Sequence, residues 1–248
     1  MNNVTPLLEV RHLSKNFGPV QALDDLSMYV NPGEVVALAG DNGAGKTTLI
    51  KAISGVYRPS SGQVLLKGQP VSFSSPQEAR ESGIETIYQD LALADNLTIG
   101  ANIFLGREPM RKAFGFLPVL DRPKMAAAAK STMALLDFHV SRLDAPVSNF
   151  SGGQRQAVAI GRAVYWNAQV LIMDEPTAAL GVPEQRKVIS LIHQLKAQGR
   201  GVIFISHNLQ DIFAVSDRIV VLRRGVMAGE RRIADTTHDE VVKLMVGG

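Results

Sequence analysis

Gly40-Asp41-Asn42-Gly43-Ala44-Gly45-Lys46-Thr47 is the stretch that decides the fold of this chain. It satisfies the pattern G-x-x-x-x-G-K-[ST] at every fixed position. An apolar run, Val35–Ala39, precedes it, and a helix-like segment at residues 48–54 follows it. A strand, a glycine-rich loop and a helix in this order predict a phosphate-binding loop. The glycines let backbone N–H groups turn toward an anion, and the helix N-terminus adds its positive dipole end. Lys46 is expected to reach the β- and γ-phosphates of a nucleotide, and the Thr47 hydroxyl to ligate Mg²⁺.

The overall composition excludes several classes of protein. The chain has 248 residues, of which 46% are hydrophobic, and this is enough for one large α/β domain or a domain carrying an inserted sub-domain. It has no cysteine, which excludes disulfides, thiol catalysis and cysteine-ligated zinc. The net charge is only +3, without a basic run longer than two residues, so nucleic-acid binding is not expected. Neither a signal peptide nor a long apolar run is recognisable, so a location in the cytoplasm is predicted.

The apolar pattern predicts alternating strands and helices on both sides of a helical section. Besides the strand at Val35–Ala39, strands are expected at residues 7–13, 26–30, 62–67, 71–73, 84–88, 170–173, 202–206 and 219–223. Helices are expected at residues 76–82, 124–136, 157–166, 184–198, 209–214 and 239–245. Residues 106–123 contain three prolines and are expected to form an irregular surface segment.

These elements predict one α/β domain over residues 1–248. Residues 1–90 and 167–248 are expected to form a nucleotide-binding core of the P-loop NTPase type. This core consists of a parallel sheet with helices on both faces and an additional antiparallel β layer. Residues 91–166 are expected to form an α-helical sub-domain inserted into it.

A second motif is the run Val170-Leu171-Ile172-Met173-Asp174-Glu175, in which two carboxylates follow four apolar residues. Such a run is typical of a buried parallel strand, and the ligands of these sheets bind at the carboxyl ends of the strands. Asp174 is therefore expected near Mg²⁺ and Glu175 beside the γ-phosphate. Together with the phosphate-binding loop, this pair predicts a site for nucleotide hydrolysis.

A third motif is Phe150-Ser151-Gly152-Gly153-Gln154. Ser151 can cap the helix that follows, and the two glycines expose backbone N–H groups at its start. This predicts a second anion-binding site with no obvious use within its own domain.

With these three motifs in this order, nearly the whole chain resembles the ATP-binding cassette family. The resemblance implies that Ser151-Gly152-Gly153-Gln154 is the signature motif, which binds the γ-phosphate of ATP held by the opposite protomer. It also implies that Gln89 is the glutamine of the Q-loop. His207, after the strand at residues 202–206, resembles the switch histidine, and Phe17 resembles the aromatic residue that stacks on adenine.

The same resemblance implies a mechanism in which positioning and charge neutralisation do most of the work. ATP would be held by Phe17 and by residues Gly40 to Thr48, and Mg²⁺ by Thr47, Gln89 and Asp174. Glu175 would polarise the attacking water, and His207 would contact the γ-phosphate. Ser151 and Gly153 of a second copy would close the site, so two chains are expected to sandwich two ATP molecules.

One departure from the family pattern lies in the loop after Glu175. The family usually has Ser-Ala-Leu-Asp there, whereas this chain has Ala178-Ala179-Leu180-Gly181. The hydroxyl is missing at Ala178 and the carboxylate at Gly181, so communication between the two sites is expected to be weaker or arranged differently.

Three stretches of the chain resemble the ATPases of ribose- and fructose-type monosaccharide importers more specifically. They are the phosphate-binding loop itself, Ile87-Tyr88-Gln89-Asp90, and Ala101-Asn102-Ile103-Phe104-Leu105-Gly106-Arg107-Glu108. The resemblance implies a homodimeric ATPase peripheral to the cytoplasmic face of the inner membrane. It would power a permease docked near residues 89–107, and a sugar-binding protein would take part indirectly. The apolar residues of this segment suit a partner surface, although packing within the sub-domain explains at least half of them: Leu91, Leu93, Leu97, Ile103, Phe104 and Leu105.

Three alternative functions remain at the level of sequence. Related cassettes act on DNA or the ribosome, but they insert long coiled coils or fuse two cassettes, and this insertion is short and lacks heptads. A small-molecule kinase would share the phosphate-binding loop but has no use for the signature motif. An exporter is the third alternative, although exporter cassettes are usually fused to their membrane spans. The transported sugar is not encoded here, because selectivity would lie in the binding protein and the permease.

Overall fold

The computed structural model describes residues 5–136, 138, 142–178 and 180–247. Their contacts divide the chain into two compact units. The first unit comprises Met1–Thr86, Ala168–Pro176 and Ile192–Gly248, and the second comprises Ile87–Asn167 and Thr177–Leu191. The predicted insertion at residues 91–166 falls within the second unit, to which the contacts add residues 87–90, 167 and 177–191. The predicted domain limits themselves stay a prediction.

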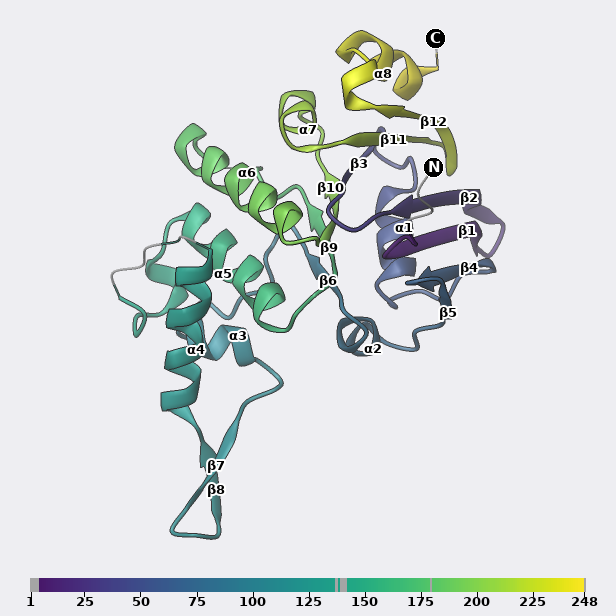
Figure 1. Cartoon of the computed structure of the whole chain (residues 1–248). Coiled ribbons are helices and arrows are strands. Elements are labelled where there is room, and N and C mark those ends of the chain that lie inside the picture. Colours follow the sequence, from purple (N-terminus) through teal and green to yellow (C-terminus); the bar gives the residue numbers. More distant parts are fainter. Residues whose placement is uncertain (1–4, 137, 139–141, 179, 248) are drawn as a thin grey trace. The chain divides into compact units, whose positions relative to one another are not determined.

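A six-stranded sheet carries the phosphate-binding loop (Figure 1). Its strands follow the order β12 (Val226–Arg232), β11 (Arg218–Arg223), β3 (Val35–Ala39), β10 (Gly201–Ile205), β9 (Val170–Asp174) and β6 (Ile84–Ile87). Strands β11, β3, β10 and β9 are mutually parallel, whereas β12 is antiparallel to β11. Every residue of β3 and β10 is buried, as expected of central parallel strands covered on both faces.

A four-stranded antiparallel sheet forms the second layer of the first unit, as predicted. Its order is β2 (Val20–Val30), β1 (Leu8–Phe17), β4 (Ser61–Leu66) and β5 (Gln69–Val71). A single hydrophobic core joins both sheets to helix α1 (Lys46–Ile53). Its buried members include Leu8, Leu26, Val36, Leu38, Leu49, Ile53, Ile203 and Val220. The loop between β3 and α1 is therefore anchored at both ends in the core.

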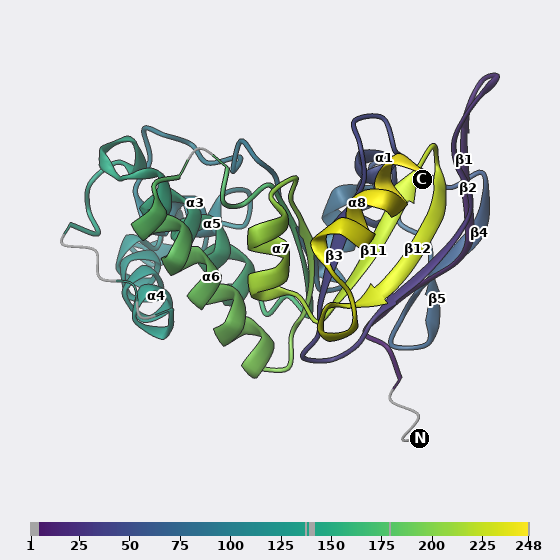
Figure 2. The same ribbon diagram turned by 90° about the horizontal axis from the view of Figure 1, so that it is seen from above.

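The remaining helices of the first unit lie at its surface. They are α2 (Pro76–Glu81), α7 (Leu209–Val215) and α8 (His238–Val246), with a 3₁₀ turn η2 at Ile233–Asp235. Helix α8 packs against β11 and β12 (Figure 2). A Cβ on Gly229 would lie 3.0 Å from Leu244 Cδ2. Helix α6 (Val182–Ala197) begins in the second unit and ends in the first.

The second unit is mainly helical, as predicted. It contains α3 (Ile99–Phe104), α4 (Arg122–Leu135), a 3₁₀ turn η1 (Val147–Asn149) and α5 (Gly152–Tyr165). The rings of Phe104, Tyr165 and Trp166 meet edge to face at 4.8–5.7 Å, and Trp166 Nε1 donates to the Ile103 carbonyl at 2.8 Å. Tyr165 and Trp166 are therefore packing residues of the sub-domain. No helix in the described parts of either unit is long and apolar enough to cross a membrane.

The prediction of an irregular segment at residues 106–123 is wrong. Strands β7 (Met110–Ala113) and β8 (Leu117–Leu120) form an antiparallel hairpin there. Its prolines occupy positions that regular structure tolerates. Pro118 lies in a two-stranded ribbon, where its missing N–H can face outward, and Pro123 lies in the first turn of α4.

Two smaller differences concern strands of the first unit. No strand was expected at residues 226–232, yet β12 follows β11 through Arg224 and Gly225, both at positive φ, as a two-residue hairpin turn requires. The strand expected at 71–73 lies two residues earlier, as β5, because the chain already turns at Lys67 and Gly68.

Candidate active site

The phosphate-binding loop has the backbone that its glycines predict. Gly40 has φ 146°, and a Cβ there would lie 2.3 Å from the Leu222 carbonyl oxygen. Gly45 caps α1 in the left-handed conformation and provides no side-chain acceptor. The first N–H groups of α1 consequently have neither an intrahelical partner nor a side-chain cap, so they remain available to an anion.

Lys46, the first residue of α1, lies over the loop. Its Nζ donates to the carbonyl oxygens of Gly40 at 2.6 Å and Asp41 at 3.0 Å. Burial lowers the pKa of this ammonium from its ordinary value, while the charges of Glu175, Asp174 and Asp41 act in the opposite direction. The ammonium is therefore partly desolvated and held among loop oxygens, where a phosphate oxygen can compete for it.

The strand register brings the acidic motif and the loop to the same edge of the sheet. β10 lies between β3 and β9, and its residue Ile205 pairs with Leu38 on one side and Asp174 on the other. The phosphate-binding loop, Asp174 and His207 consequently follow the carboxyl ends of three adjacent parallel strands, where nucleotide sites of such sheets lie.

Asp174 and Glu175 have different environments at this edge. Burial raises the pKa of the Asp174 carboxyl, and the neighbouring Glu175 charge raises it further, while Lys46 lowers it. Glu175 has φ 51°, an uncommon conformation for a residue other than glycine. Its N–H donates to the Ile205 carbonyl at 2.9 Å. This backbone position turns the Glu175 side chain out of the strand path, toward His207.

The Glu175 carboxylate and the His207 imidazole form a pair at the sheet edge. Glu175 Oε2 lies 2.9 Å from His207 Nδ1, with the glutamate side chain 18% exposed and the histidine 81% exposed. Their orientation nevertheless leaves Oε2, a buried acceptor, without a hydrogen bond from any described residue. A buried carboxylate oxygen in this state can accept a proton from a water molecule.

The donor set fits Mg²⁺. The Thr47 hydroxyl and the Asp174 carboxylate are hard oxygen ligands, and Mg²⁺ in nucleotide sites usually combines one or two such ligands with phosphate oxygens and water. No cluster of three or more histidine, cysteine, aspartate or glutamate side chains suited to a metal exists among the described residues. An ion here would therefore depend on the nucleotide for most of its ligands.

Phe17 lies at the end of β1 and is 41% exposed. Its ring meets that of Tyr57 edge to face at 5.1 Å, and Lys15 Nζ lies 5.1 Å from the Phe17 ring centroid. Lys15 also donates to the Arg58 carbonyl at 2.8 Å, which ties β1 to the segment after α1. Tyr57 was not predicted as a site residue, because a tyrosine in a loop carries no distinguishing sequence signal.

The signature motif starts α5 in the second unit. Ser151 Oγ accepts from Gln154 N–H at 3.3 Å, and Gln154 Oε1 accepts from Ser151 N–H at 2.9 Å, so the predicted cap is a complete capping box. A Cβ on Gly153 would lie 2.8 Å from Glu184 Cγ, and one on Gly152 would lie 2.8 Å from Leu180 Cδ2. Close packing against residues 180–184 is thus a second reason for both glycines.

The loop of residues 178–181 is described only in part, because Ala179 lies outside the described residues. Gln185 Nε2 donates to the Leu180 carbonyl at 3.1 Å. A side chain on Gly181 would lie 2.9 Å from Glu184 Oε2. The predicted effect of Ala178 and Gly181 on communication between sites stays a prediction.

Gln89 is exposed in a turn of the second unit. The segment after it has an unusual backbone conformation and is bonded to α5. Leu91 and Ala92 have positive φ, and Arg162 on α5 donates to the Ala92 carbonyl at 3.1 Å. Of the apolar residues expected at a partner surface, Ile103 and Phe104 are 1% and 2% exposed. These two belong to the core, whereas Leu105 is 47% exposed and Leu91, Leu93 and Leu97 are half-buried.

Asn102 organises this segment and was not recognised from sequence, although a polar residue inside an apolar helical run is a signal. It is fully buried. Its Oδ1 accepts from Ala94 N–H at 2.8 Å, and its Nδ2 donates to three carbonyl oxygens, those of Ala94, Leu97 and Thr98, at 3.1–3.3 Å. The amide therefore fixes the backbone between Gln89 and α3.

Asn102→Ala is expected to lower the free energy of unfolding by about 2–3 kcal/mol, because it leaves several backbone groups without their partner. Urea unfolding followed by circular dichroism measures the loss. Asn149→Ala, at an exposed position in η1, is the matched control and should change the free energy by less than about 0.5 kcal/mol. Equal stability of the two variants would show that water replaces the Asn102 amide.

Comparison with known proteins agrees with this geometry. Residues 23–178 match the family model described as ABC transporter. The chain is 49% identical to the xylose/arabinose import ATP-binding protein XylG of Sulfolobus acidocaldarius and 44% identical to the fructose import ATP-binding protein FrcA of Rhizobium meliloti. Each alignment covers 98% of this chain and 94% of the relative. It is 46% identical to the ribose import ATP-binding protein RbsA 1 of Rubrobacter xylanophilus, of which it covers 47%.

Solved structures give the same result. A nucleotide-free ATP-binding cassette from an ABC transporter superposes with a TM-score of 0.81 at 27% identity, covering 98% of this chain and 96% of the other. A cassette in its ADP conformation superposes with a TM-score of 0.80 at 26% identity, covering 98% and 99%. The predicted α/β fold is confirmed, and the chain belongs to the ABC transporter family as one of its ATP-binding cassettes.

Proposed function

We propose that this chain hydrolyses ATP to power a membrane permease that takes up a monosaccharide. One observation carries the hydrolysis, namely the buried Glu175 oxygen that lies beside His207 at the sheet edge shared with the phosphate-binding loop. The similarity over almost the whole chain to ATP-binding proteins of xylose/arabinose and fructose import supports the sugar. No observation favours an action on nucleic acid or the ribosome.

In this proposal, Glu175 accepts a hydrogen bond from the attacking water and orients it toward the γ-phosphate. Lys46 and the N–H groups at the start of α1 neutralise charge that develops on the phosphate oxygens. Thr47, Asp174 and Gln89 would hold Mg²⁺, which would supply further neutralisation of the phosphate charge. His207 would contact the γ-phosphate through the ring nitrogen that does not face Glu175, and Phe17 would stack on the base.

The site is proposed to be completed by a second copy of the chain. The capping box at Ser151 engages the N–H groups of Ser151 and Gln154, so those of Gly152 and Gly153 at the start of α5 are not used by it. Ser151 and Gly153 of the second copy would bind the γ-phosphate there, so two chains would enclose two ATP molecules. Because γ-phosphate contacts would hold the dimer closed, hydrolysis would open it and drive the permease.

The permease is proposed to dock on the segment 89–107. With Ile103 and Phe104 assigned to the core, the exposed Leu105 and the half-buried Leu91, Leu93 and Leu97 remain for this contact. The location that follows is peripheral to the cytoplasmic face of the membrane. A sugar-binding protein on the opposite face would deliver the substrate to the permease without touching this chain.

Affinity purification of the tagged chain from gently solubilised membranes of its host tests this proposal. We expect one multi-span permease to co-purify, and Leu105→Asp to reduce its recovery about tenfold or more, because a buried unpaired charge opposes docking. Leu135→Asp, at a 57% exposed position on α4, is the matched control and should leave recovery unchanged. Recovery of ribosomes or nucleic-acid enzymes without a membrane protein would overturn the transport role. If the permease co-purifies as expected, reconstitution of the complex in proteoliposomes would identify the sugar as the one that stimulates ATP hydrolysis.

A further inference from the structure

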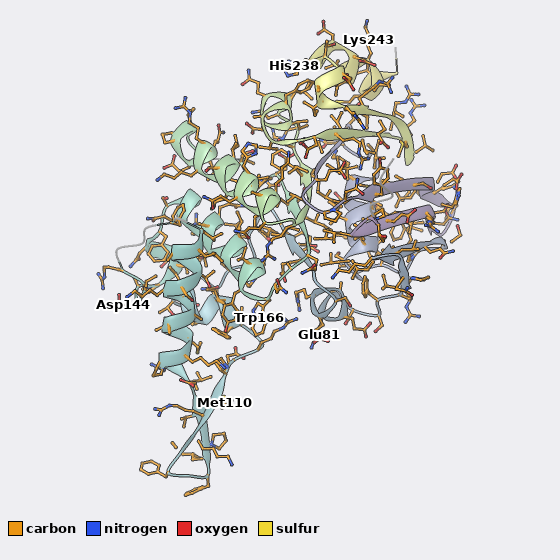
Figure 3. The ribbon with its side chains drawn as sticks, in the orientation of Figure 1. Glu81, Met110, Asp144, Trp166, His238 and Lys243 are labelled. Atoms are coloured by element: carbon orange, nitrogen blue, oxygen red, sulfur yellow. The ribbon has the colours of Figure 1, made fainter. Side chains whose placement is uncertain are left out.

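The β7–β8 hairpin projects from the helices of the second unit, as Figures 1 and 3 show. Met110 pairs with Leu120, Arg111 with Val119, Lys112 with Pro118, and Ala113 with Leu117. Since paired residues share a face, each face carries one cation among apolar side chains. A two-stranded hairpin with neither face in a core is at best marginally stable in water, so this element is built for a contact outside its own unit.

The tip of the hairpin is the most exposed apolar part of the described chain. Phe114 is 90% exposed and Phe116 is 79% exposed. Three more apolar side chains on the strands are also exposed, namely Met110, Leu117 and Leu120. Scattered exposed hydrophobic residues need no explanation, but a continuous group of this kind marks an interaction site.

The turn itself favours this interpretation. Phe114 has φ 51° and Gly115 has φ 81°, a conformation that hairpin turns normally give to asparagine, aspartate or glycine. A bulky side chain in the left-handed region is a backbone outlier. The phenylalanine ring therefore serves a purpose that the turn does not require, since a glycine or asparagine would relieve the backbone.

Charge is arranged along the hairpin in a definite order. Arg111 and Lys112 are exposed on β7, and residues 109–120 contain no acidic side chain. The carboxylates that flank this segment in the sequence, Glu108 and Asp121, accept hydrogen bonds at its base. Glu108 accepts from the N–H of Gly106, and Asp121 caps α4 by accepting from Lys124 N–H. Within residues 109–120 the charged side chains are therefore the cations Arg111 and Lys112.

We propose that the tip of the β7–β8 hairpin inserts Phe114 and Phe116 into the headgroup region of a bilayer that contains anionic lipids, with Arg111 and Lys112 pairing with the lipid phosphates. A lipid surface accounts for apolar residues on both faces and at the tip, because acyl chains can surround an inserted element. The cations complement the negative surface of such a bilayer. This contact goes beyond the proposed permease-docking segment and requires neither the permease nor a sugar.

Flotation of the purified full-length chain with vesicles tests the proposal. Vesicles of phosphatidylglycerol and phosphatidylcholine in equal parts should carry the wild-type chain upward. Vesicles of phosphatidylcholine alone should carry at least about tenfold less of the chain. Phe114→Ser combined with Phe116→Ser should weaken binding to the anionic vesicles about tenfold or more. Arg111→Gln combined with Lys112→Gln should weaken it to a similar extent and remove most of its salt dependence.

Matched controls separate this contact from general effects. Leu135→Ser combined with Val242→Ser removes two other exposed apolar side chains and should bind vesicles like the wild type. All variants should keep the wild-type ATP hydrolysis rate in solution, which shows that they are folded and tests the proposed function independently.

Three results would overturn the lipid contact. The first is that the wild-type chain does not bind anionic vesicles. The second is that the double phenylalanine variant binds them as well as the wild type does. The third is that the wild-type chain binds both kinds of vesicle equally. Loss of a permease or of self-association in the phenylalanine variant, without any vesicle binding by the wild type, would instead assign the tip to a protein partner and would also reject the proposal.

Discussion

Glu175→Gln is expected to slow ATP hydrolysis by about 10²–10⁴-fold and to leave ATP binding intact. Glutamine has the same shape as glutamate, so the backbone at φ 51° and its hydrogen bond to the Ile205 carbonyl can persist. The variant loses the acceptor that would take a proton from the attacking water, because an amide oxygen is a far weaker base than a carboxylate. Phosphate release at saturating MgATP measures the rate, and fluorescence of a labelled ATP analogue measures binding.

Glu81→Gln is the matched control for this experiment. Glu81 lies on α2, where it is exposed (Figure 3) and accepts a hydrogen bond from Gln77 Nε2. The Glu81→Gln variant loses the same charge as Glu175→Gln, but at a position outside the proposed site. It should therefore hydrolyse ATP at the wild-type rate. Near wild-type activity of Glu175→Gln would remove Glu175 from the catalytic role and direct attention to His207.

The same variant makes dimerisation visible. Since γ-phosphate contacts are proposed to hold two copies together, blocked hydrolysis should accumulate an ATP-bound dimer. Size-exclusion chromatography with multi-angle light scattering should show twice the 26.7 kDa of one chain with ATP and a single chain with ADP. A monomer with ATP, despite lost hydrolysis, would show that the chain needs its permease to dimerise.

Residues whose role depends on backbone conformation were predictable from sequence. The loop Gly40 to Gly45 needs glycine because of φ values and close approaches that other residues do not tolerate, so its pattern can be recognised in the sequence. The buried strands β3, β9 and β10 could also be predicted from the sequence, since a central parallel strand must be apolar on both faces. The capping box at Ser151 belongs to the same class.

Other features depend on contacts between distant segments, which no local pattern encodes. The edge-to-face support of Phe17 by Tyr57 joins residues forty positions apart in the sequence. The four hydrogen bonds of Asn102 depend on how residues 94–98 fold back over α3. For the same reason the sequence could not say which of the apolar residues between Gln89 and Arg107 pack within the sub-domain. Ile103 and Phe104 do so, because a neighbour covers them that no local pattern reveals.

The β7–β8 hairpin shows a different limit of local reasoning. Proline and glycine usually mark irregular segments, and residues 106–123 contain both. The strand Leu117–Leu120 still forms around Pro118, because a ribbon of two strands leaves one edge of each strand unpaired. Composition predicted a loop, whereas pairing geometry permits a hairpin.

Lys46→Ala is expected to weaken MgATP binding by about 100-fold and to abolish measurable hydrolysis. Lys46 Nζ lies within 3.0 Å of two loop carbonyl oxygens, at the position from which it can donate to β- and γ-phosphate oxygens. Burial has already removed part of its hydration and lowers its pKa, so an ammonium–phosphate contact here has a smaller desolvation cost than at the surface. Isothermal titration with MgATP measures the loss of affinity.

The fold should survive this change, because alanine is the best helix former and Lys46 begins α1. Lys51→Ala, in the last turn of the same helix, is the matched control. It removes an equal charge, whose ammonium lies 5.5 Å from the centroid of the Tyr57 ring, and should keep the affinity for MgATP within a few-fold of wild type. If Lys46→Ala retained micromolar affinity while Lys51→Ala did not, the phosphates would bind nearer the far end of α1 and the loop would not be their site. Because the lysine and the N–H groups of the loop are proposed to bind the same anion, removal of the lysine alone tests where that anion binds.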